Sequence, residues 1–440
     1  MSTLNKIKRV FTREGGPAVK LGPEAELRRT LMNCLLWEDQ FYDSGVTIAE
    51  RIRALVAEVK PEVCAALAVE AREAMKLRHA PLLVVREMAR LPSHRGLVAE
   101  TLARVIQRPD EMTEFLAIYW ADALGPMQQR KKQAVSAQVK KGLARALAKF
   151  DAYQLAKYDR DGAVRLRDVL FLVHAKPKDA EQEKVWKQLV DGELVAADTW
   201  EVGLSAGEDK RQVFERLIAE KKLGALALLR NLRLMQKAGV PREVIAGALS
   251  QMRTERVLPF RFITAARHAP DFEPELEQAM LSSLAGHVKL PGKTRLLIDV
   301  SGSMDAVMSH QSEMTRLDAA CGLAILAREV CEEVEIFTFS QGVKKVPPRH
   351  GFALRDAIVM SQPHGGTYLG AAVSEVDVKG ERLIVFTDEQ SHDKVPAPRG
   401  LGYMVNVASY QHAVGFGPWR RIDGFSEAII SWIATVEGAA

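Results

Sequence analysis

Three hydroxyl and two carboxyl side chains in the last third of the 440-residue sequence follow either an apolar run or a pair of glycines. The first three members alternate directly after the run 296–298, the fourth follows two glycines, and the fifth ends a second apolar run at 382–387. The set is Asp299, Ser301, Ser303, Thr367 and Asp388. Carboxylate and hydroxyl oxygens suit a hard divalent cation, and Mg²⁺ needs few protein oxygens because it keeps several waters. The set therefore predicts a divalent-cation site, with Mg²⁺ as the expected ion.

Strands and helices alternate around these residues. Strands are expected at 294–301, 335–340, 382–388 and 401–408, and helices at 316–333 and 425–436. Continuous apolar strands that alternate with helices indicate a doubly wound parallel sheet, covered on both faces. Ligands of such sheets bind beyond the carboxyl ends of the strands, where the strand order reverses. We expect the five residues to meet there; the alternative is a turn in which Asp and Ser cap a helix.

Catalysis by such a metal would require a nearby general base. The sequence contains no HExxH motif and no further His or carboxylate cluster around the site. We therefore expect a binding protein and not an enzyme. A metal-dependent nuclease is a weaker alternative.

The pattern DxSxS…T…D resembles the metal-ion-dependent adhesion site of von Willebrand factor A domains, over about residues 290–436. The resemblance implies that Ser301, Ser303 and Thr367 ligate the ion directly or nearly so, while Asp299 and Asp388 act largely through waters. It also implies an open coordination position that receives a carboxylate from a protein partner. Glu389, directly after the last of these residues, is an additional carboxylate that would raise the affinity for the ion or obstruct an acidic partner.

Residues 24–285 instead indicate one helix after another. Apolar residues of 47–59 fall on one helical face, with Thr47 as an N-cap candidate, and Pro61 stands at an expected first helical position. A later helix should stop at Gly239, with Pro241 opening the next. Successive helices with short turns indicate an α-solenoid of stacked, HEAT-like helix pairs. The expected divisions are an N-terminal segment at 1–23, the helical domain at 24–288 and the α/β domain at 289–440.

Charge also divides the chain, with a net charge of +8 over residues 1–288 and −3 over residues 289–440. A basic front part suggests a polyanionic partner, although solvated helix surfaces would give the same balance. The densest basic segment contains Arg130, Lys131, Lys132, Lys140, Lys141, Arg145 and Lys149. The last two of these and Lys141 are spaced four residues apart, so we expect one stripe on a helix that contacts RNA phosphates.

Three segments in the order LAKYDRDGAVRLRDVLFLVHAKP, ALLRNLRLMQKAGV and VLPFRFITAAR resemble the TROVE domain of Ro ribonucleoproteins, whose C-terminal neighbour is an A domain. The similarity spans about residues 15–436. It implies helical repeats closed into a ring, with small structured RNAs (Y RNAs) on the outer surface and single-stranded 3′ ends of aberrant noncoding RNAs in the hole. His174 and Lys176 match the RNA-contacting His-x-Lys-Pro corner of that family. Arg230 and Asn231 fit either an RNA contact or a buried polar pair between helices equally well.

The sequence thus predicts a non-enzymatic, monomeric Ro-like protein that binds small noncoding RNA and RNA 3′ ends, in ribonucleoprotein assembly and in RNA surveillance or decay. The family suggests a ribonuclease as a protein partner. The rival interpretation is a Mg²⁺-dependent protein-interaction adaptor. Four scattered cysteines without CxxC spacing, no signal peptide and no membrane-length apolar run indicate a cytoplasmic protein without a membrane partner.

Overall fold

The protein is described by a computed structural model that has two compact units. We call residues 23–37 and 45–209 the helical unit, and residues 210–440 with 1–22 and 38–44 the mixed unit. The structure describes residues 10–11, 17–18, 22–32, 45–73, 77–120, 134–254, 257, 259–284, 289–309, 312–408, 414, 418–423, 429, 433 and 437.

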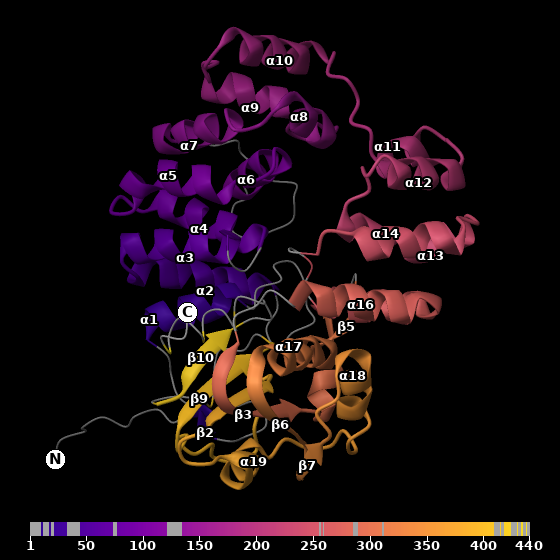
Figure 1. The fold of residues 1–440 in the computed structure, drawn as a ribbon. Helices are drawn as coiled ribbons and strands as arrows, with labels where there is room; N and C mark the ends of the chain where they lie inside the picture. The colour runs from indigo at the N-terminus through magenta and orange to yellow at the C-terminus, as the bar shows by residue number, and fades with distance from the viewer. Residues whose placement is uncertain are drawn as a thin grey trace, which may run out of the picture. The chain divides into compact units, whose positions relative to one another are not determined.

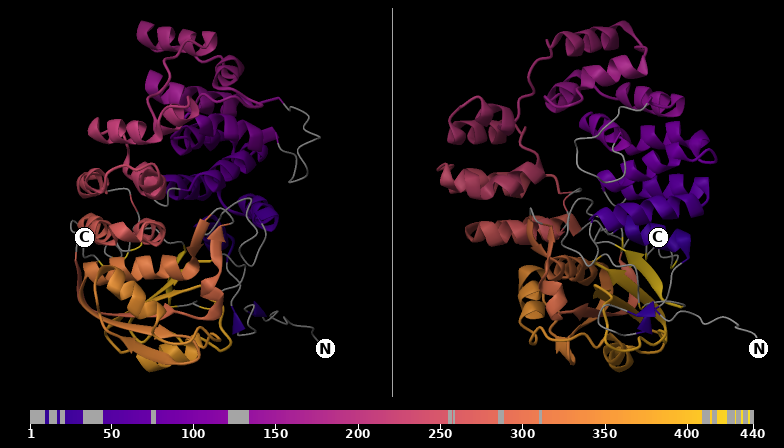
Figure 2. Two further views of the ribbon diagram at one scale, coloured as in Figure 1. Left: turned by 90° about the vertical axis from the view of Figure 1, so that its right-hand side faces the viewer. Right: turned by 180° about the vertical axis from the view of Figure 1, so that it is seen from behind.

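The helical unit is a stack of short helices, drawn from indigo to magenta in Figures 1 and 2. Helices two apart along the chain contact each other, as α3 contacts α5 and α7 contacts α5 and α9, and some consecutive helices also do, as α3 contacts α4. This packing confirms the predicted helical repeats. The helices are α1 (Pro23–Met32), α2 (Gly45–Glu58), α3 (Pro61–Glu73), α4 (His79–Arg90), α5 (Arg95–Val105), α6 (Asp110–Trp120), α7 (Ala137–Leu147), α8 (Ala152–Tyr158), α9 (Leu166–Val173), α10 (Ala180–Asp191) and α11 (Trp200–Ser205).

The apolar periodicity of the sequence buries the expected helix faces. Ile48, Ile52 and Val56 of α2 are fully buried in one core. Pro61 is the first residue of α3, as predicted, but α2 begins at Gly45, so Thr47 lies inside the helix and is not its N-cap.

A glycine allows α7 to pack closely on α5. A Cβ at Gly142 would lie 3.0 Å from the carbonyl oxygen of Ala99 and 3.0 Å from the Cβ of Leu102. A larger residue at this position would push the two helices apart, because helix backbones and core side chains have little room to move.

The mixed unit begins with further helices. They are α12 (Lys210–Ala219), α13 (Ala225–Lys237), α14 (Arg242–Gln251), α15 (Pro259–His268), the 3₁₀ helix η2 (Pro270–Phe272) and α16 (Glu273–Leu284). Gly239, with φ of 74°, follows α13 in the left-handed conformation typical of a helix C-terminus, as expected. Pro241 is the N-cap of α14 and so precedes its first turn.

A six-stranded sheet forms the core of the rest of the mixed unit. Its strands are β3 (Leu290–Asp299), β6 (Cys331–Phe339), β7 (Val343–Val346), β8 (Arg382–Thr387), β9 (Leu401–Asn406) and β10 (Arg420–Asp423), in the order β10-β9-β8-β3-β6-β7. All neighbours are parallel except β6 and the edge strand β7, so the predicted parallel sheet is confirmed. The helix predicted at 425–436 lies outside the described residues, apart from helical, buried Ile429 and Ile433.

Helices cover both faces of this sheet. On one face, α17 (Arg316–Val330) packs on β3, β6 and β8, and α18 (Gly351–Val359) packs on α17. On the other, α19 (Leu369–Val376) shares a core with Leu297 and Val385. The remaining described elements are the pair β1 (Val10–Phe11) and β2 (Pro17–Ala18), the 3₁₀ helix η3 (Gly302–Asp305), and the hairpin of β4 (Val307–Ser309) and β5 (Ser312–Thr315).

Within the mixed unit, α15 lies against α17. The backbone nitrogen of Phe260 would be 3.1 Å from a Cβ at Gly322, so a larger residue here would force a small shift of the two helices. Arg267 donates a 2.6 Å hydrogen bond to Asp318 in the first turn of α17. Helix α15 therefore fixes the position of α17 through the Arg267–Asp318 hydrogen bond and the close approach at Gly322.

Candidate functional site

The predicted metal-binding residues lie where the strand order of the sheet reverses. The chain leaves β3 for β6 on one side, whereas β8 pairs with β3 on the other side. Asp299 is the last residue of β3, and Asp388 directly follows β8. The location therefore agrees with the ligand position expected for an open α/β sheet.

Asp299 is fully buried and held by hydrogen bonds from two neighbouring segments. Its Oδ1 accepts from the backbone nitrogen of Ser301 at 2.9 Å, and its Oδ2 accepts from the hydroxyl of Thr387 at 2.6 Å. Burial and, to a lesser extent, the nearby carboxylate of Asp388 raise the pKa of Asp299 to about 7. Two carboxylates in a dry environment repel each other, and a bound cation would relieve this repulsion.

The two predicted serines and the threonine are brought together by loop contacts. The hydroxyls of Ser301 and Ser303 lie 3.2 Å apart. The backbone nitrogen of Gly302, between them, donates to the carbonyl of Gly365 at 3.0 Å, which joins this loop to the one that carries Thr367. The backbone nitrogen of His392, beyond β8, donates to the carbonyl of Thr367 at 2.9 Å. The three loops that carry the five predicted residues thus converge beyond the carboxyl ends of the central strands β3 and β8.

This set fits a cation that prefers oxygen ligands. It offers three hydroxyl and two carboxyl groups, all from loops tied to one another. Across the described ranges, no three His, Cys, Asp or Glu side chains gather in a way that could hold a metal. The set therefore consists of hydroxyl and carboxyl oxygens, the ligand type that Mg²⁺ prefers.

Arg316, which the sequence did not suggest, reaches into the same set. It is the first residue of α17 and its side chain is 3% exposed. Its Nη1 donates to Asp388 Oδ2 at 3.1 Å and to the carbonyl of Ser303 at 3.2 Å. Sequence alone could not place it there, because an arginine at the start of a helix is usually solvated.

Glu389 does not act as the additional carboxylate near the metal that the sequence suggested. It is fully buried and has a left-handed backbone, with φ of 58°. Its Oε1 accepts from Arg421 Nη2 at 2.7 Å, and its Oε2 accepts from the backbone nitrogen of Val414 at 3.2 Å. The carboxylate therefore binds Val414, beyond β9, and Arg421 of the edge strand β10.

The second group of predicted residues lies in the helical unit. Lys141 and Arg145 are exposed, one turn apart on α7, and no described carboxylate pairs with either. Lys140, beside them, is partly buried. Some other cations of this unit form ion pairs, such as Arg72 with Glu111 and Arg104 with Glu73. We therefore regard Lys141 and Arg145 as the part of the predicted stripe that is available to a phosphate.

Lys149 does not continue this stripe. The helix ends at Leu147, so the expected spacing of Lys141, Arg145 and Lys149 along one helix is wrong. The ammonium of Lys149 donates to the carbonyl oxygens of Ala103 and Ile106 at the end of α5. Arg130, Lys131 and Lys132, the rest of the predicted basic segment, lie outside the described residues.

His174 and Lys176 are exposed where the chain leaves α9. His174 is the C-cap of that helix, with a left-handed φ of 51° that projects it from the helix end. Phe171, three residues earlier, is 59% exposed. An exposed aromatic ring close in sequence to a histidine and a lysine is a feature of sites that bind single-stranded RNA. The sequence did not suggest Phe171, because an apolar residue at helical spacing is expected to be buried.

Arg230 and Asn231 do not form the buried polar pair that the sequence left open. Asn231 is buried and donates to the carbonyl of Ala227 in its own helix at 2.9 Å. Arg230 is exposed. The pKa of Arg261, on the adjacent helix α15, is lowered mainly by the burial of Arg261 and secondly by the positive charge of Arg230. No described carboxylate pairs with either arginine, so they form a second cationic spot, in the mixed unit.

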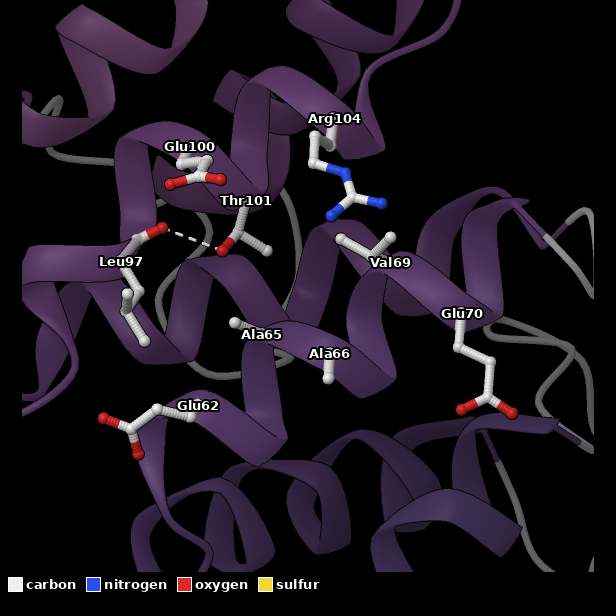
Figure 3. Close-up of a pocket in the computed structure, with 9 residues that line it drawn as sticks. All are labelled: Glu62, Ala65, Ala66, Val69, Glu70, Leu97, Glu100, Thr101 and Arg104. Carbon is white, nitrogen blue, oxygen red and sulfur yellow. Dashed lines mark hydrogen bonds between the residues drawn. The ribbon is translucent and has the colours of Figure 1, made fainter.

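The groove in Figure 3 lies between α3 and α5 and has a volume of about 450 Å³. Alanine, valine and leucine side chains line it, while Glu62, Glu70 and Glu100 project from its sides. The hydroxyl of Thr101 donates to the carbonyl of Leu97 at 2.8 Å. These carboxylates would repel phosphates, so we do not place nucleic acid in this groove.

Comparisons with known proteins identify relatives of the chain. The TROVE domain family matches residues 30–193 and 192–317. The chain is similar in structure to the crystal structure of Deinococcus radiodurans RO (RSR) protein, with a TM-score of 0.63 and 19% sequence identity over 95% of this chain and 100% of that one. No protein with curated annotation shows significant sequence similarity. No helix among the described residues is long and apolar enough to cross a membrane.

Proposed function

Because the chain belongs to the TROVE domain family, we propose that it binds RNA with its helices, and that its ligands are small noncoding RNAs and the single-stranded 3′ ends of aberrant RNAs. In this proposal it is a monomeric, cytoplasmic, non-enzymatic protein that takes part in ribonucleoprotein assembly and in RNA surveillance or decay. The observation that carries the proposal is the pair of exposed cations Lys141 and Arg145 on α7, which lack a described carboxylate partner.

The chemistry of these residues favours RNA over a protein partner. Affinity for nucleic acid comes first from lysine and arginine at phosphates, with release of counterions. Sequence-tolerant binding of single strands adds base stacking on exposed aromatic rings. Phe171, His174 and Lys176 at the end of α9 offer both kinds of contact within six residues.

We further propose that the α/β domain binds Mg²⁺ at Asp299, Ser301, Ser303, Thr367 and Asp388. The hydroxyl groups would contact the ion directly, and the two carboxylates would act largely through waters. The ion would supply an open coordination position for a carboxylate of a protein partner, such as a ribonuclease. The oxygen set is also the observation that supports the rival function, a Mg²⁺-dependent protein-interaction adaptor, for this domain.

Titration of the full chain with RNA tests the proposal. The ligand is a hairpin RNA with a single-stranded 3′ tail, and the controls are the blunt hairpin and duplex DNA of the same length. We expect the tailed RNA to bind most tightly, and its affinity to fall steeply between 50 and 200 mM salt, because lysine and arginine replace counterions on the RNA. Equal affinity for duplex DNA, or affinity that does not change with salt, would contradict RNA binding and favour the adaptor.

A further inference from the structure

Arg316 introduces a positive charge into the proposed metal site. Its guanidinium contacts Asp388 at 3.1 Å and the Ser303 carbonyl at 3.2 Å, and both side chains of the ion pair are almost completely buried. We propose that Arg316 is an intramolecular competitor of the divalent cation, so that the ion binds in exchange for the Arg316–Asp388 ion pair and therefore binds weakly. This inference rests on the proposed metal site.

The first argument is the balance of charge in the buried site. Asp299 and Asp388, when both are ionised, carry two negative charges, which one divalent cation neutralises. With the guanidinium still in place, the same ion would leave one positive charge in excess. Uncompensated charge in a dry protein interior is costly, so the ion and the guanidinium oppose each other's binding.

The second argument is the anchoring of Arg316. Its backbone nitrogen donates to the carbonyl of Ala306 at 3.0 Å. Thr315 and Asp318 form a capping box around it, and Arg267 of α15 holds Asp318 at 2.6 Å. The backbone at this position is therefore fixed, and exchange requires only that the side chain leave Asp388. Such a fixed competitor would keep the carboxylate compensated whenever the ion is absent.

An alternative role for Arg316 predicts the opposite effect. Residues that hydrogen-bond a ligating carboxylate often orient it for the metal, and their loss weakens metal binding by about 10- to 100-fold. If Arg316 is such a positioning residue, its removal lowers the affinity for the ion. If it is a competitor, its removal raises that affinity.

The experiment compares three variants of the full chain with the wild type. Arg316→Met removes the charge with little change in length, Arg316→Lys keeps the charge, and Arg328→Met removes a half-buried charge at the far end of the same helix. Binding of Mg²⁺ is measured by calorimetry and of Mn²⁺ by electron paramagnetic resonance. We expect Arg316→Met to bind both ions about tenfold more tightly or better, on the scale of known outer-shell effects. Arg316→Lys and Arg328→Met should stay close to the wild type.

The outcomes separate this inference from the metal site on which it rests. Unchanged or weaker binding by Arg316→Met, with clear binding by the wild type, overturns the competitor and leaves the site intact. No binding by any of the four proteins overturns both.

A measurement on the wild type covers the case in which Arg316→Met does not fold. The Nε–Hε resonance of Arg316, assigned by its absence from Arg316→Lys, should move as Mg²⁺ is added to the wild-type chain. A resonance that stays in place while Mg²⁺ binds would show that no exchange occurs and would overturn the inference.

Discussion

Individual side chains in this protein have roles that depend on neighbours far away in sequence. Asp299, Ser301, Ser303 and Asp388 could be proposed as one set because they follow apolar strands, and Thr367 could be added because it follows two glycines in the same sequence pattern. Arg316 could not, because its contact with Asp388 spans 72 residues and depends on where α17 begins. Lys149 was placed incorrectly by its sequence spacing, since it does not extend the basic stripe but caps the end of α5.

The reactivity of the cysteines tests whether individual side chains are buried as the structure shows. Among the cysteines that the structure describes, Cys64, Cys321 and Cys331 are free and buried. Burial raises the pKa of Cys64 to about 11, so only about one thiol in a thousand is ionised at pH 8. We expect iodoacetamide to label these three cysteines slowly in the native chain and rapidly after denaturation, as measured by peptide mass spectrometry. Fast labelling of Cys64 in the native chain would contradict its burial.

Phe171 provides a second test. We expect Phe171→Ala to weaken binding of the tailed RNA by about 1–3 kcal/mol, the usual contribution of one stacked base, and to change binding of the blunt hairpin little. Leu226→Ala, which removes a similarly exposed side chain from α13, is the matched control. Equal losses for tailed and blunt RNA would show that Phe171 does not contact an unpaired base.

At the scale of elements, the fold followed closely from hydrophobic pattern. Strands β8 and β9 and the last four residues of β3 are largely buried on both faces, and their apolar runs in sequence predicted a buried parallel sheet. Strands β7 and β10, with the sequences VKKV and RRID, were not predicted. Both lie at the edges of the sheet, where half-exposed strands carry charged residues and lose the apolar signal. Their formation depends on pairing with β6 and β9, which local sequence does not encode.

RNA binding by helix α7 can be tested by reversing its exposed charges. Reversing two charges with Lys141→Glu and Arg145→Glu together should weaken RNA binding for all sequences and reduce its salt dependence, because two phosphate contacts are lost. The matched control reverses Lys344 and Lys379, two exposed lysines of the α/β domain, and changes the net charge equally. Binding is measured by fluorescence anisotropy at several salt concentrations. A similar loss in both double variants would mean that only the overall charge matters.

At the scale of the whole molecule, the distribution of charge suggests a division of roles. The first 288 residues have a net charge of +8 and the remainder has −3. The exposed cations Lys141 and Arg145 of α7, which have no carboxylate partner among the described residues, lie in the helical unit, whereas the proposed metal site lies in the mixed unit. If the two sites are independent, an RNA-binding function and a protein-binding function can coexist in one chain, and the adaptor interpretation then describes only the α/β domain.

Independence of the two sites can be tested with one substitution. Asp299→Asn keeps an oxygen to accept from the backbone of Ser301, whereas alanine would leave that nitrogen and the Thr387 hydroxyl without their acceptor. We expect the asparagine variant to stay folded and to lose Mg²⁺ binding, because a charge next to the cation is removed. RNA affinity should change by less than about 1 kcal/mol if the two sites share no contacts, since such sites act additively.

The measurement is RNA titration of Asp299→Asn and wild type, with Mg²⁺ and with EDTA. Asp305→Asn is the control, since it removes a nearby, half-exposed carboxylate that lies outside the proposed set and pairs with His364. His174→Ala sets the scale for the loss of an RNA contact. If Asp299→Asn or EDTA weakens RNA binding as much as His174→Ala does, the ion connects protein and phosphate directly. In that case the charge of the first 288 residues would be insufficient to hold RNA, and the division of roles between helices and α/β domain would be wrong.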